Sequence, residues 1–341
     1  MNKTAVVILN YNGRELLRQF LPSVIQFSSS AKIIVADNHS TDGSVDVVRS
    51  EFPSIEIIQL PRNLGYCGGY NFALKEVEAE YYVLLNSDVE VTEGWLDPII
   101  GLMSSNRSIA AAQPKIRSYR NQTQFEYAGA AGGFIDTLGY PFCRGRMFNS
   151  LETDTGQYND SIPVFWATGA CMVVNATIFH EMGGLDEDFF AHMEEIDLCW
   201  KLHRFGYEVY SVGKCHVYHL GGGTLSKSNP NKTYLNFRNG LSLIFRHLGP
   251  GELTWKLPLR MVMDWCAALS FLFAGSGKDA LAVAKAHVHF LLRLPKEFRK
   301  RKALVVPFND LMAVPIYRHM VVIDYFLKGR KRFTDLPIKN P

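Results

Sequence analysis

The stretch TAVVILNYNGRELLRQFLPSVIQFSSSAKIIVADNHSTDGS, residues 4–44, contains two short apolar runs on either side of a helical pattern. The alternation continues to residue 104. It predicts strands over 5–9, 32–36, 55–60 and 81–85, and helices over 14–27, 44–52, 69–79 and 93–104. Strands that are apolar almost throughout and alternate with helices are typical of a parallel sheet covered on both faces. We therefore predict an α/β fold.

Polar residues follow each of these strands directly. In open α/β sheets, ligands bind beyond the carboxyl ends of the strands. The candidate binding residues are therefore Asn10-Tyr11-Asn12, Asp37-Asn38, Arg62-Asn63 and Asn86-Ser87-Asp88. Asp37 is suited to accept hydrogen bonds from a ribose or a base. Because DNHSTDGS is also rich in capping residues, Asp37 or Ser40 could instead cap the next helix.

The pattern changes twice along the rest of the chain. Short apolar runs and Gly-rich turns over 107–165 indicate excursions or hairpins, and they precede strands over 165–174, 208–212 and 215–218 and a helix over 191–205. After residue 240 the pattern is helical without strands, and we expect Pro295 to end a helix. We predict two domains, residues 1–240 and a helical extension over 241–341.

The composition excludes several classes of protein. With 47% hydrophobic and 20% charged residues, the chain is neither disordered nor collagen-like. Its six cysteines form no C-x-x-C pair, which argues against a disulfide scaffold or a zinc ribbon and fits a reducing cytosol. The first apolar run is too short for a signal peptide. No run reaches the roughly 18–20 uncharged apolar residues of a membrane span.

The charge is distributed unevenly. Residues 240–341 hold 17 Lys or Arg and 7 Asp or Glu, whereas residues 1–239 hold 19 and 26. A cationic helical segment suits an anionic membrane surface, where Trp265, Phe271 and Phe273 could lie at the interface. The alternative is a helical subdomain that packs on the sheet and has a basic exterior. Nucleic acid is a poorer fit, because the basic helices lack interleaved aromatic residues for base stacking.

Asn86-Ser87-Asp88 follows the buried run YYVLL. A carboxylate at the exit of such a strand can bind a divalent cation that also bridges a diphosphate. The same three residue types also form ordinary turns. His219, in VYHLGGGT, would make a mixed nitrogen and oxygen site with Asp88, acceptable to Mn²⁺ and tolerable for Mg²⁺. A lone histidine is nevertheless more often structural.

The connection RNLGYCGGYN, residues 62–71, is rich in glycine and enters a helix. Glycines let the backbone approach a ligand, and helix N-termini favour phosphate groups. The segment is neither G-x-G-x-x-G after a first strand nor a Walker A loop, so it predicts neither dinucleotide binding nor a P-loop.

The segment GGLDEDFFAHMEEIDLCWKLHRFGY places Glu194, Glu195 and Asp197 at the start of one helix. Asp197 has Lys201 four residues later as an ion-pair partner. Glu194 and Glu195 have no comparable partner nearby in the sequence. Because adjacent helical side chains project about 100° apart, we expect only one to enter the cleft, as a general base. An acidic first turn without a catalytic role is the alternative.

Taken in order, seven motifs resemble family-2 glycosyltransferases with the GT-A fold, in the rhamnosyltransferase-like branch. They are VVILNYNG, IVADNHSTDGS, NLGYCGGYN, VLLNSDVEV, ATGACMVV, GLDEDFFAHMEEIDLCWKLHRFGY and HLGGGT. Together they span residues 4–225. The resemblance implies a Rossmann-like mixed sheet with a helical C-terminal extension.

The resemblance also implies roles for single residues. The nucleoside of a sugar nucleotide would be surrounded by Asn10, Tyr11 and Asp37. The adjoining pocket would be shaped by Arg62, Asn63, Gly65 and Asn71. Asp88 would be the last carboxylate of a D-x-D element and hold Mg²⁺ or Mn²⁺, with Asn86 at the first position and His219 as the late metal contact. The acceptor side would be lined by Thr168, Gly169 and Ala170.

The base in the family's Glu-Asp pair corresponds to Glu195, with Glu194 before it. The implied reaction inverts the anomeric carbon and transfers one sugar to a glycan or polyprenyl-linked acceptor. The branch that the chain resembles suggests rhamnose from dTDP-rhamnose as the donor. A cell-surface polysaccharide pathway at the cytoplasmic face of the membrane follows from the same resemblance. A non-catalytic relative that binds a nucleotide or a glycan is the alternative, which the Asn86 and Glu195 variants keep open.

Overall fold

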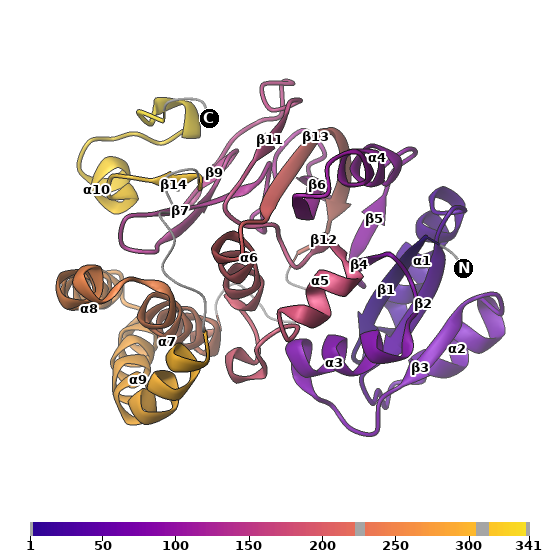
Figure 1. Ribbon diagram of the computed structural model, residues 1–341, viewed down its shortest axis with the longest axis horizontal. Coiled ribbons are helices and arrows are strands. Elements are labelled where there is room, and N and C mark those ends of the chain that lie inside the picture. The colour runs from indigo at the N-terminus through magenta and orange to yellow at the C-terminus, as the bar shows by residue number, and fades with distance from the viewer. Residues whose placement is uncertain (1–2, 222–228, 305–313, 339–341) are drawn as a thin grey trace.

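The computed structural model describes residues 3–221, 229–304 and 314–338 (Figure 1). A mixed sheet forms its centre, in the order β11 (Ser161–Pro163), β13 (Glu208–His219), β6 (Ile109–Ser118), β12 (Cys171–Asn175), β4 (Tyr81–Asn86), β1 (Thr4–Asn10), β2 (Lys32–Asp37) and β3 (Glu56–Gln59). The short strand β5 (Val89–Val91) pairs with β13. Strands β4, β1, β2 and β3 are parallel, as predicted, and β12 runs antiparallel to both β4 and β6.

Alternate residues of each parallel strand point to opposite faces of the sheet. Val6 and Ile8 of β1 pack with one set of helices: α1 (Arg14–Phe27), α2 (Ser44–Glu51) and α4 (Asp97–Ser105). Ala5 and Val7 pack on the other side with α3 (Gly65–Ala73), α5 (Ala176–Glu181) and α6 (Glu194–Arg204). This two-sided burial explains why the strands are apolar almost throughout.

A smaller sheet lies beside the first. Its order is β10 (Ser150–Leu151), β9 (Arg146–Met147), β8 (Pro141–Cys143), β7 (Gly133–Asp136) and β14 (Ile316–Tyr317). The hairpins expected over 107–165 are therefore present. Because β14 pairs in parallel with β7, residues 316–317 lie beside residues 135–136.

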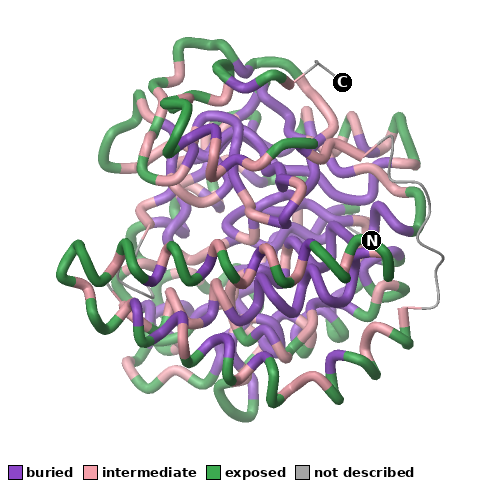
Figure 2. Tube along the Cα trace, turned by 90° about the vertical axis from the view of Figure 1, so that its left-hand side faces the viewer, coloured by how far each residue is buried: buried purple, intermediate pink, exposed green. Residues whose placement is uncertain are grey.

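The helices of the C-terminal region are α7 (Pro230–His247), α8 (Pro250–Phe273), α9 (Gly277–Ala303) and α10 (Val321–Phe326). Short 3-10 helices occur elsewhere along the chain as well as here: η1 (Leu74–Glu76), η2 (Glu187–Phe189) and η4 (Phe333–Asp335). Residue 240, the expected domain boundary, lies inside α7. Among the described residues, no helix combines the length and the apolar character needed to cross a bilayer. On the side of the molecule where the C-terminal helices lie, buried and exposed residues alternate along the helices (Figure 2).

Pro295 does not end a helix, contrary to the sequence prediction. Helix α9 continues through it to Ala303. The residues buried before and after it include Phe290 and Glu297, both fully buried, so one packed face spans the proline. A proline interrupts one backbone hydrogen bond, and this packing compensates for the loss.

Other predicted bounds were also wrong. Residues 208–212 and 215–218 belong to one strand, β13, whose register with β6 shifts between Val212 and His216. The strand predicted from residue 165 begins at Cys171, and the long strand β6 was not separated from the turns that follow it. These elements lie where the sheet becomes mixed, and there the apolar pattern no longer alternates with helices.

Candidate functional site

The carboxyl ends of β1 and β2 are joined by a buried hydrogen-bond network. The amide Nδ2 of Asn10 donates to Asp37 Oδ1 at 3.0 Å and to Ser40 Oγ at 3.1 Å. Asp37 Oδ2 accepts the backbone N–H of Ser40 at 3.0 Å. Asn10 and Asp37 are both buried, and Asn10 Oδ1 has no partner among the described residues. The network holds the Asp37 carboxylate in place beside the strand ends.

Neither Asp37 nor Ser40 caps α2, which corrects one reading of the sequence. The residue before the helix is Gly43, in a left-handed conformation, and it makes no side-chain cap. Asp42 instead accepts the backbone N–H of Ser44 at 3.0 Å. The capping function therefore falls to Asp42, and Asp37 makes its contacts within the strand-end network.

A second network extends this edge to the glycine-rich connection. Asn38 Nδ2 donates to Asn63 Oδ1 at 3.1 Å, and Asn38 Oδ1 accepts the N–H of Leu64 at 2.8 Å. Asn63 Oδ1 also accepts the N–H of Gly65 at 2.9 Å. Tyr11 is 45% exposed at the end of β1 and Arg62 is exposed too. The buried Asn38 and the exposed Asn63 thus shape the loop, while Tyr11 and Arg62 are available to a ligand.

Two residues of this connection have structural reasons for their type. Gly65 has φ +70°, and a Cβ there would lie 3.0 Å from the ring of Phe190. Asn71 uses both amide atoms on the backbone of Leu185, donating at 2.7 Å and accepting at 3.0 Å. Asn71, predicted to shape the nucleotide pocket, therefore also joins α3 to the loop before α6.

Asp88 and His219 lie together, as the sequence interpretation required. His219 Nε2 is 3.1 Å from Asp88 Oδ1, and His219 Nδ1 is 3.1 Å from Glu126 Oε2. All three side chains are buried. Hydrogen bonds that the ring donates to both carboxylates outweigh burial and raise the pKa of His219 to about 10. The protonated ring of His219 therefore lies between the carboxylates of Asp88 and Glu126 and contacts both.

Glu126 was not identified from the sequence. It lies in FEYAG, within a segment where no periodic pattern marks single residues, and it reaches His219 from 93 residues away. Its backbone neighbour Ala128 donates an N–H to its Oε2, which fixes the carboxylate. Only the folded chain shows that this glutamate orients His219.

The donor set can accept a hard divalent cation through two ligands. Asp88 supplies oxygen and His219 Nε2 supplies nitrogen once its proton is lost, a mixture that suits Mn²⁺. Within residues 3–221, 229–304 and 314–338, no cluster of three or more His, Cys, Asp or Glu side chains is arranged as a complete metal site. Residues 222–224 of the HLGGGT motif lie outside the described residues.

The predicted acceptor-side residues adjoin the end of β4. Asn86 donates its backbone N–H to Ala170 at 3.0 Å. Tyr66 of α3 donates its hydroxyl to the carbonyl of Gly169 at 2.7 Å, and a Cβ on Gly169 would lie 2.6 Å from that hydroxyl. Thr168 is buried and accepts the N–H of Ala170 at 3.2 Å. The turn 168–170 is thus held between β4 and α3.

Glu194 and Glu195 begin α6, and each has a buried Oε2 without a hydrogen-bond partner among the described residues. Burial raises the pKa of Glu195 to about 7. Burial and the nearby charge of Glu195 raise the pKa of Glu194 well above its ordinary value. Carboxyl groups with such raised pKa values are suited to exchange protons near neutral pH.

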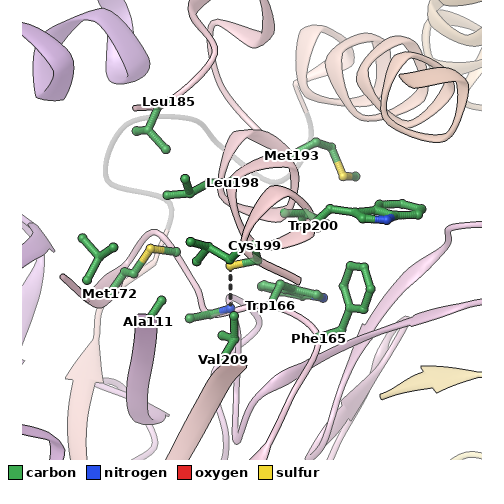
Figure 3. Packing of buried hydrophobic residues seen from close by; sticks show 14 of the residues in the cluster. Ala111, Phe165, Trp166, Met172, Leu185, Met193, Leu198, Cys199, Trp200 and Val209 are labelled. Carbon is green, nitrogen blue, oxygen red and sulfur yellow. Dashed lines mark hydrogen bonds between the residues drawn. The ribbon is translucent and has the colours of Figure 1, made fainter. Parts of the chain in front are cut away.

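The rest of α6 is fixed firmly. Asp197 pairs with Lys201 at 2.9 Å, as predicted, and its other oxygen is 2.9 Å from His247 Nε2. Leu198, Cys199 and Trp200 are buried, and Trp200 contacts Phe165 edge to face (Figure 3). A helix anchored in this way presents Glu194 and Glu195 from a rigid support.

The glutamates and the predicted binding loops belong to one region. Burial first, and then the charges of Tyr70, Glu194 and Glu195, raise the pKa of Tyr66, whose hydroxyl bonds Gly169. A separate cavity of about 550 Å³, lined by residues that include Lys3, Tyr82 and His180, contains none of the predicted site residues. The candidate site therefore lies at the carboxyl ends of the strands.

Residues 5–183, more than half of the chain, match the family described as glycosyl transferase family 2. The chain belongs to glycosyl transferase family 2. It is accordingly a glycosyltransferase, and the family expected from the seven sequence motifs is confirmed.

Two curated relatives cover most of the chain. One is the N-acetylglucosaminyl-diphospho-decaprenol L-rhamnosyltransferase of Mycobacterium tuberculosis, 24% identical over 77% of this chain and 90% of its own length. The other is the low-salt glycan biosynthesis hexosyltransferase Agl10 of Haloferax volcanii, 25% identical over 70% of this chain and 74% of its own length. Both identities are low.

Solved structures confirm the predicted GT-A fold with its helical C-terminal region. TarS residues 1–349 from S. aureus, in complex with UDP-GlcNAc, has a TM-score of 0.56 and 14% identity, with 89% of this chain and 83% of that chain covered. GalNAc-T7 with UDP, GalNAc and Mn²⁺ has a TM-score of 0.55 and 16% identity, with coverage of 72% and 48%. At these identities the likeness concerns the fold alone.

Proposed function

We propose that this family 2 enzyme transfers a single sugar from a nucleoside-diphosphate sugar to an acceptor hydroxyl, with inversion at the anomeric carbon. The observation that carries the proposal is the pair of carboxyl groups at the start of α6, each with a buried oxygen that lacks a partner among the described residues. Such an oxygen is free to take the proton of an acceptor hydroxyl. We assign this role to Glu195, with Glu194 as the neighbouring acid.

The donor lies, in this proposal, across the strand ends. Asp37 and Asn10 hold the nucleoside, and Tyr11 is exposed enough to stack on a base. The adjoining pocket is formed by Arg62, Asn63, Gly65, Asn71 and Asn86. On the opposite side, the turn Thr168-Gly169-Ala170 receives the acceptor.

Asp88 and His219 would hold a divalent ion, Mg²⁺ or Mn²⁺. Bound there, the ion would stabilise the negative charge of the departing nucleoside diphosphate. The Mn²⁺ in the GalNAc-T7 structure belongs to a protein of the same fold and supports the expectation of a divalent ion. In this chain, Glu126 fixes the ring of His219 and Asp88 fixes its Nε2 edge.

We propose dTDP-rhamnose as the donor and a polyprenyl-linked glycan as the acceptor. The proposal follows the name of the M. tuberculosis relative, which transfers rhamnose to a diphospho-decaprenol-linked sugar. The reaction would then serve a cell-surface polysaccharide at the cytoplasmic face of the membrane. In this view residues 1–240 form the catalytic domain and 241–341 a basic helical extension.

The extension is proposed to touch an anionic membrane surface. Trp265 and Phe273 of α8 are exposed, whereas Phe271 is half-buried against Phe237. Several basic side chains of the extension pair with Asp186 and Asp188, so fewer of them face outward than the composition indicates. Co-sedimentation with vesicles of phosphatidylglycerol, compared with pure phosphatidylcholine, tests the contact, and equal binding to both would contradict it.

Donor turnover tests the enzyme function. Purified protein, a polyprenyl-diphosphate-linked GlcNAc acceptor and either Mn²⁺ or EDTA are incubated with dTDP-rhamnose, UDP-GlcNAc or GDP-mannose, and nucleoside diphosphate release is measured. We expect metal-dependent release with one donor, and NMR of the product should show the inverted anomeric configuration. Binding of a nucleotide without turnover of any donor would favour the non-catalytic alternative.

A further inference from the structure

The segment immediately before the two glutamates has an unusual backbone. We call residues 186–193 the strap. Phe190, His192 and Met193 have φ values of +65°, +67° and +76°, and none is a glycine. Residues with side chains adopt this region only where the surrounding structure imposes it. Some contact must therefore hold the strap in the conformation that starts α6 at Glu194.

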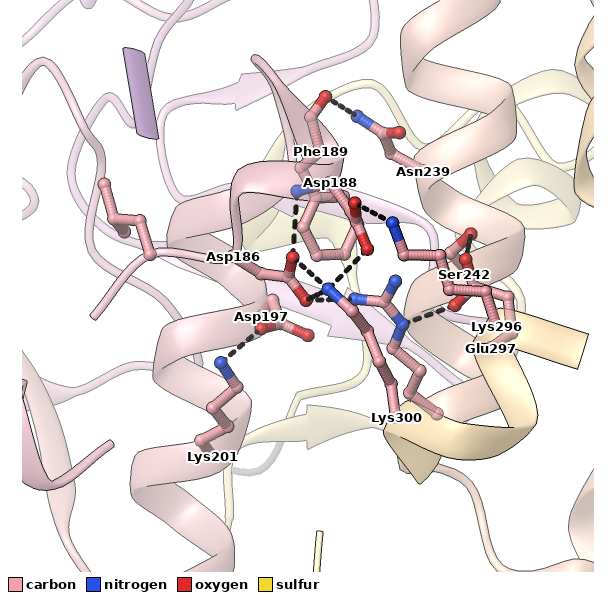
Figure 4. A network of polar contacts seen from close by, with 12 residues as sticks. Asp186, Asp188, Phe189, Asp197, Lys201, Asn239, Ser242, Lys296, Glu297 and Lys300 are labelled. Carbon is pink, nitrogen blue, oxygen red and sulfur yellow. Dashed lines mark hydrogen bonds and ion pairs between the residues drawn. The ribbon is translucent and has the colours of Figure 1, made fainter. Parts of the chain in front are cut away.

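Asn239 of α7 supplies that contact. Its Nδ2 donates to the carbonyl oxygens of Phe189 at 3.1 Å, Ala191 at 3.0 Å and His192 at 2.7 Å. The contact with Phe189 is visible in Figure 4. Its Oδ1 accepts from Arg238 Nε at 2.8 Å, which fixes the orientation of the amide. Asn239 is 1% exposed, so water does not compete for these bonds.

Basic residues of α7 and α9 hold the other end of the strap. Arg246 donates to Asp186 Oδ2 at 2.8 Å, and Lys300 bonds both Asp186 and Asp188 (Figure 4). Lys296 also pairs with Asp188. Hydrogen bonds from Lys296 and Lys300 outweigh burial and lower the pKa of Asp188 to about 2.

We propose that Asn239 is a positioning residue that aims the proton-accepting glutamate by fixing the backbone of the strap. His192, whose carbonyl it binds most closely, lies two residues before Glu194. An asparagine suits this place because one nitrogen offers two N–H donors, whereas an aspartate would present only acceptors to three carbonyl oxygens. The inference rests on the proposed role of Glu194 and Glu195.

The strap contacts are separate from those that hold α6 on the sheet. Asp197, with His247 and Lys201, and the packed side chains Leu198 and Trp200 anchor the helix body. Loss of the Asn239 amide would therefore leave α6 in place and release only its first turn. A displacement of about 1 Å at a reacting group can cost roughly 100-fold in rate.

The test compares Asn239→Ala with Thr233→Ala. Thr233 lies on the same helix, and its hydroxyl donates to Asp279 of α9 at 2.6 Å instead of to the strap. We expect Asn239→Ala to lower kcat by about 10–100-fold with little change in the donor KM, and Thr233→Ala to leave both constants near the wild-type values. Equal kcat values for Asn239→Ala and wild type, or a parallel rise in KM, would overturn the proposal.

A second variant covers the case in which Asn239→Ala does not fold. The side chain of Lys300 is 31% exposed, so Lys300→Met should preserve the fold while weakening the hold on Asp186, which keeps Arg246, and on Asp188, which keeps Lys296. We expect kcat to fall by about 3–10-fold at constant donor KM. An unchanged kcat in this variant would also overturn the inference. Absence of turnover in the wild type would instead refute the proposed function, so the two failures are distinguishable.

Discussion

The two sides of the candidate site differ in whether their carboxyl groups have hydrogen-bond partners. At the ends of β1 and β2, the carboxylate of Asp37 is bonded to Asn10 and Ser40, and its position is fixed. At the start of α6, Glu194 and Glu195 each have a buried carboxyl oxygen that lacks a partner among the described residues. A satisfied network costs little to keep, whereas an unpartnered buried carboxyl costs free energy of folding. The difference agrees with the proposed division, in which the first side would hold the donor and the second would accept a proton.

The largest test of this comparison removes the proposed base. Glu195→Gln should lower kcat by about 10²–10⁴-fold while nucleotide binding stays unchanged, because an amide cannot accept the hydroxyl proton. Steady-state kinetics and calorimetric titration with the nucleotide measure the two effects. Glu194→Gln is the matched comparison, and a larger loss in Glu194→Gln would transfer the role of base to Glu194.

The next test addresses the hydrogen-bonded residues Asp88, His219 and Glu126. Glu126→Gln should weaken Mn²⁺ binding by about 10–100-fold, because the carboxylate that orients His219, the proposed metal ligand, is lost. Electron paramagnetic resonance of free Mn²⁺ measures this without turnover. As a control, Glu152→Gln removes a carboxylate that bonds Tyr158 and should leave the affinity unchanged. Equal affinity in both variants would remove Glu126 from the metal side.

A smaller effect is expected at the ends of β1 and β2, where Asp37 has hydrogen-bond partners. Asp37→Asn should raise the donor KM by about 10-fold with kcat nearly unchanged, because it removes one charged acceptor that contributes ground-state binding. Asp42→Asn, at the start of α2, should affect stability and leave KM alone. A fall in kcat without a change in KM for Asp37→Asn would show that the two sides do not divide the work in this way.

The smallest effect concerns stability against pH. Because burial raises the pKa of Glu195 to about 7 in the folded chain, the folded state binds this proton more tightly than the unfolded state does. This contribution is present at low pH and is lost as the pH rises through about 7. Glu195→Gln should therefore gain stability relative to wild type between pH 5 and pH 8, measured by urea unfolding. Identical pH dependence would contradict the raised pKa.

Local patterns in the sequence predict the elements whose burial depends on neighbouring residues alone. The apolar runs that form β1, β2 and β4 pack between two layers of helices, so their burial is visible in single residues such as Val6 and Val7. The strand-end residues Asn10, Asp37 and Asp88 could be named for the same reason. Pro295 shows the limit, since the packing of α9 outweighs the local preference of one residue.

Contacts between distant segments could not be predicted. Glu126 meets His219 across 93 residues, and Asn239 meets His192 across 47. No spacing rule connects such pairs, because their approach depends on the mixed half of the sheet and on the docking of α7. Asn71 illustrates the same point. Its type matched a family motif, but its bonds to the Leu185 backbone appear only in the fold.

The distance along the chain between the strap and its supports bears on how the protein is made. Asn239 is synthesised 47 residues after His192, and Lys300 follows Asp186 by 114 residues. At about 5–20 residues per second, the ribosome synthesises the strand ends and Asp88, Glu126 and His219 several seconds before it synthesises α9. A nascent chain would thus complete the proposed nucleotide side first, and it would align the proposed proton acceptor only after α7 and α9 have been synthesised.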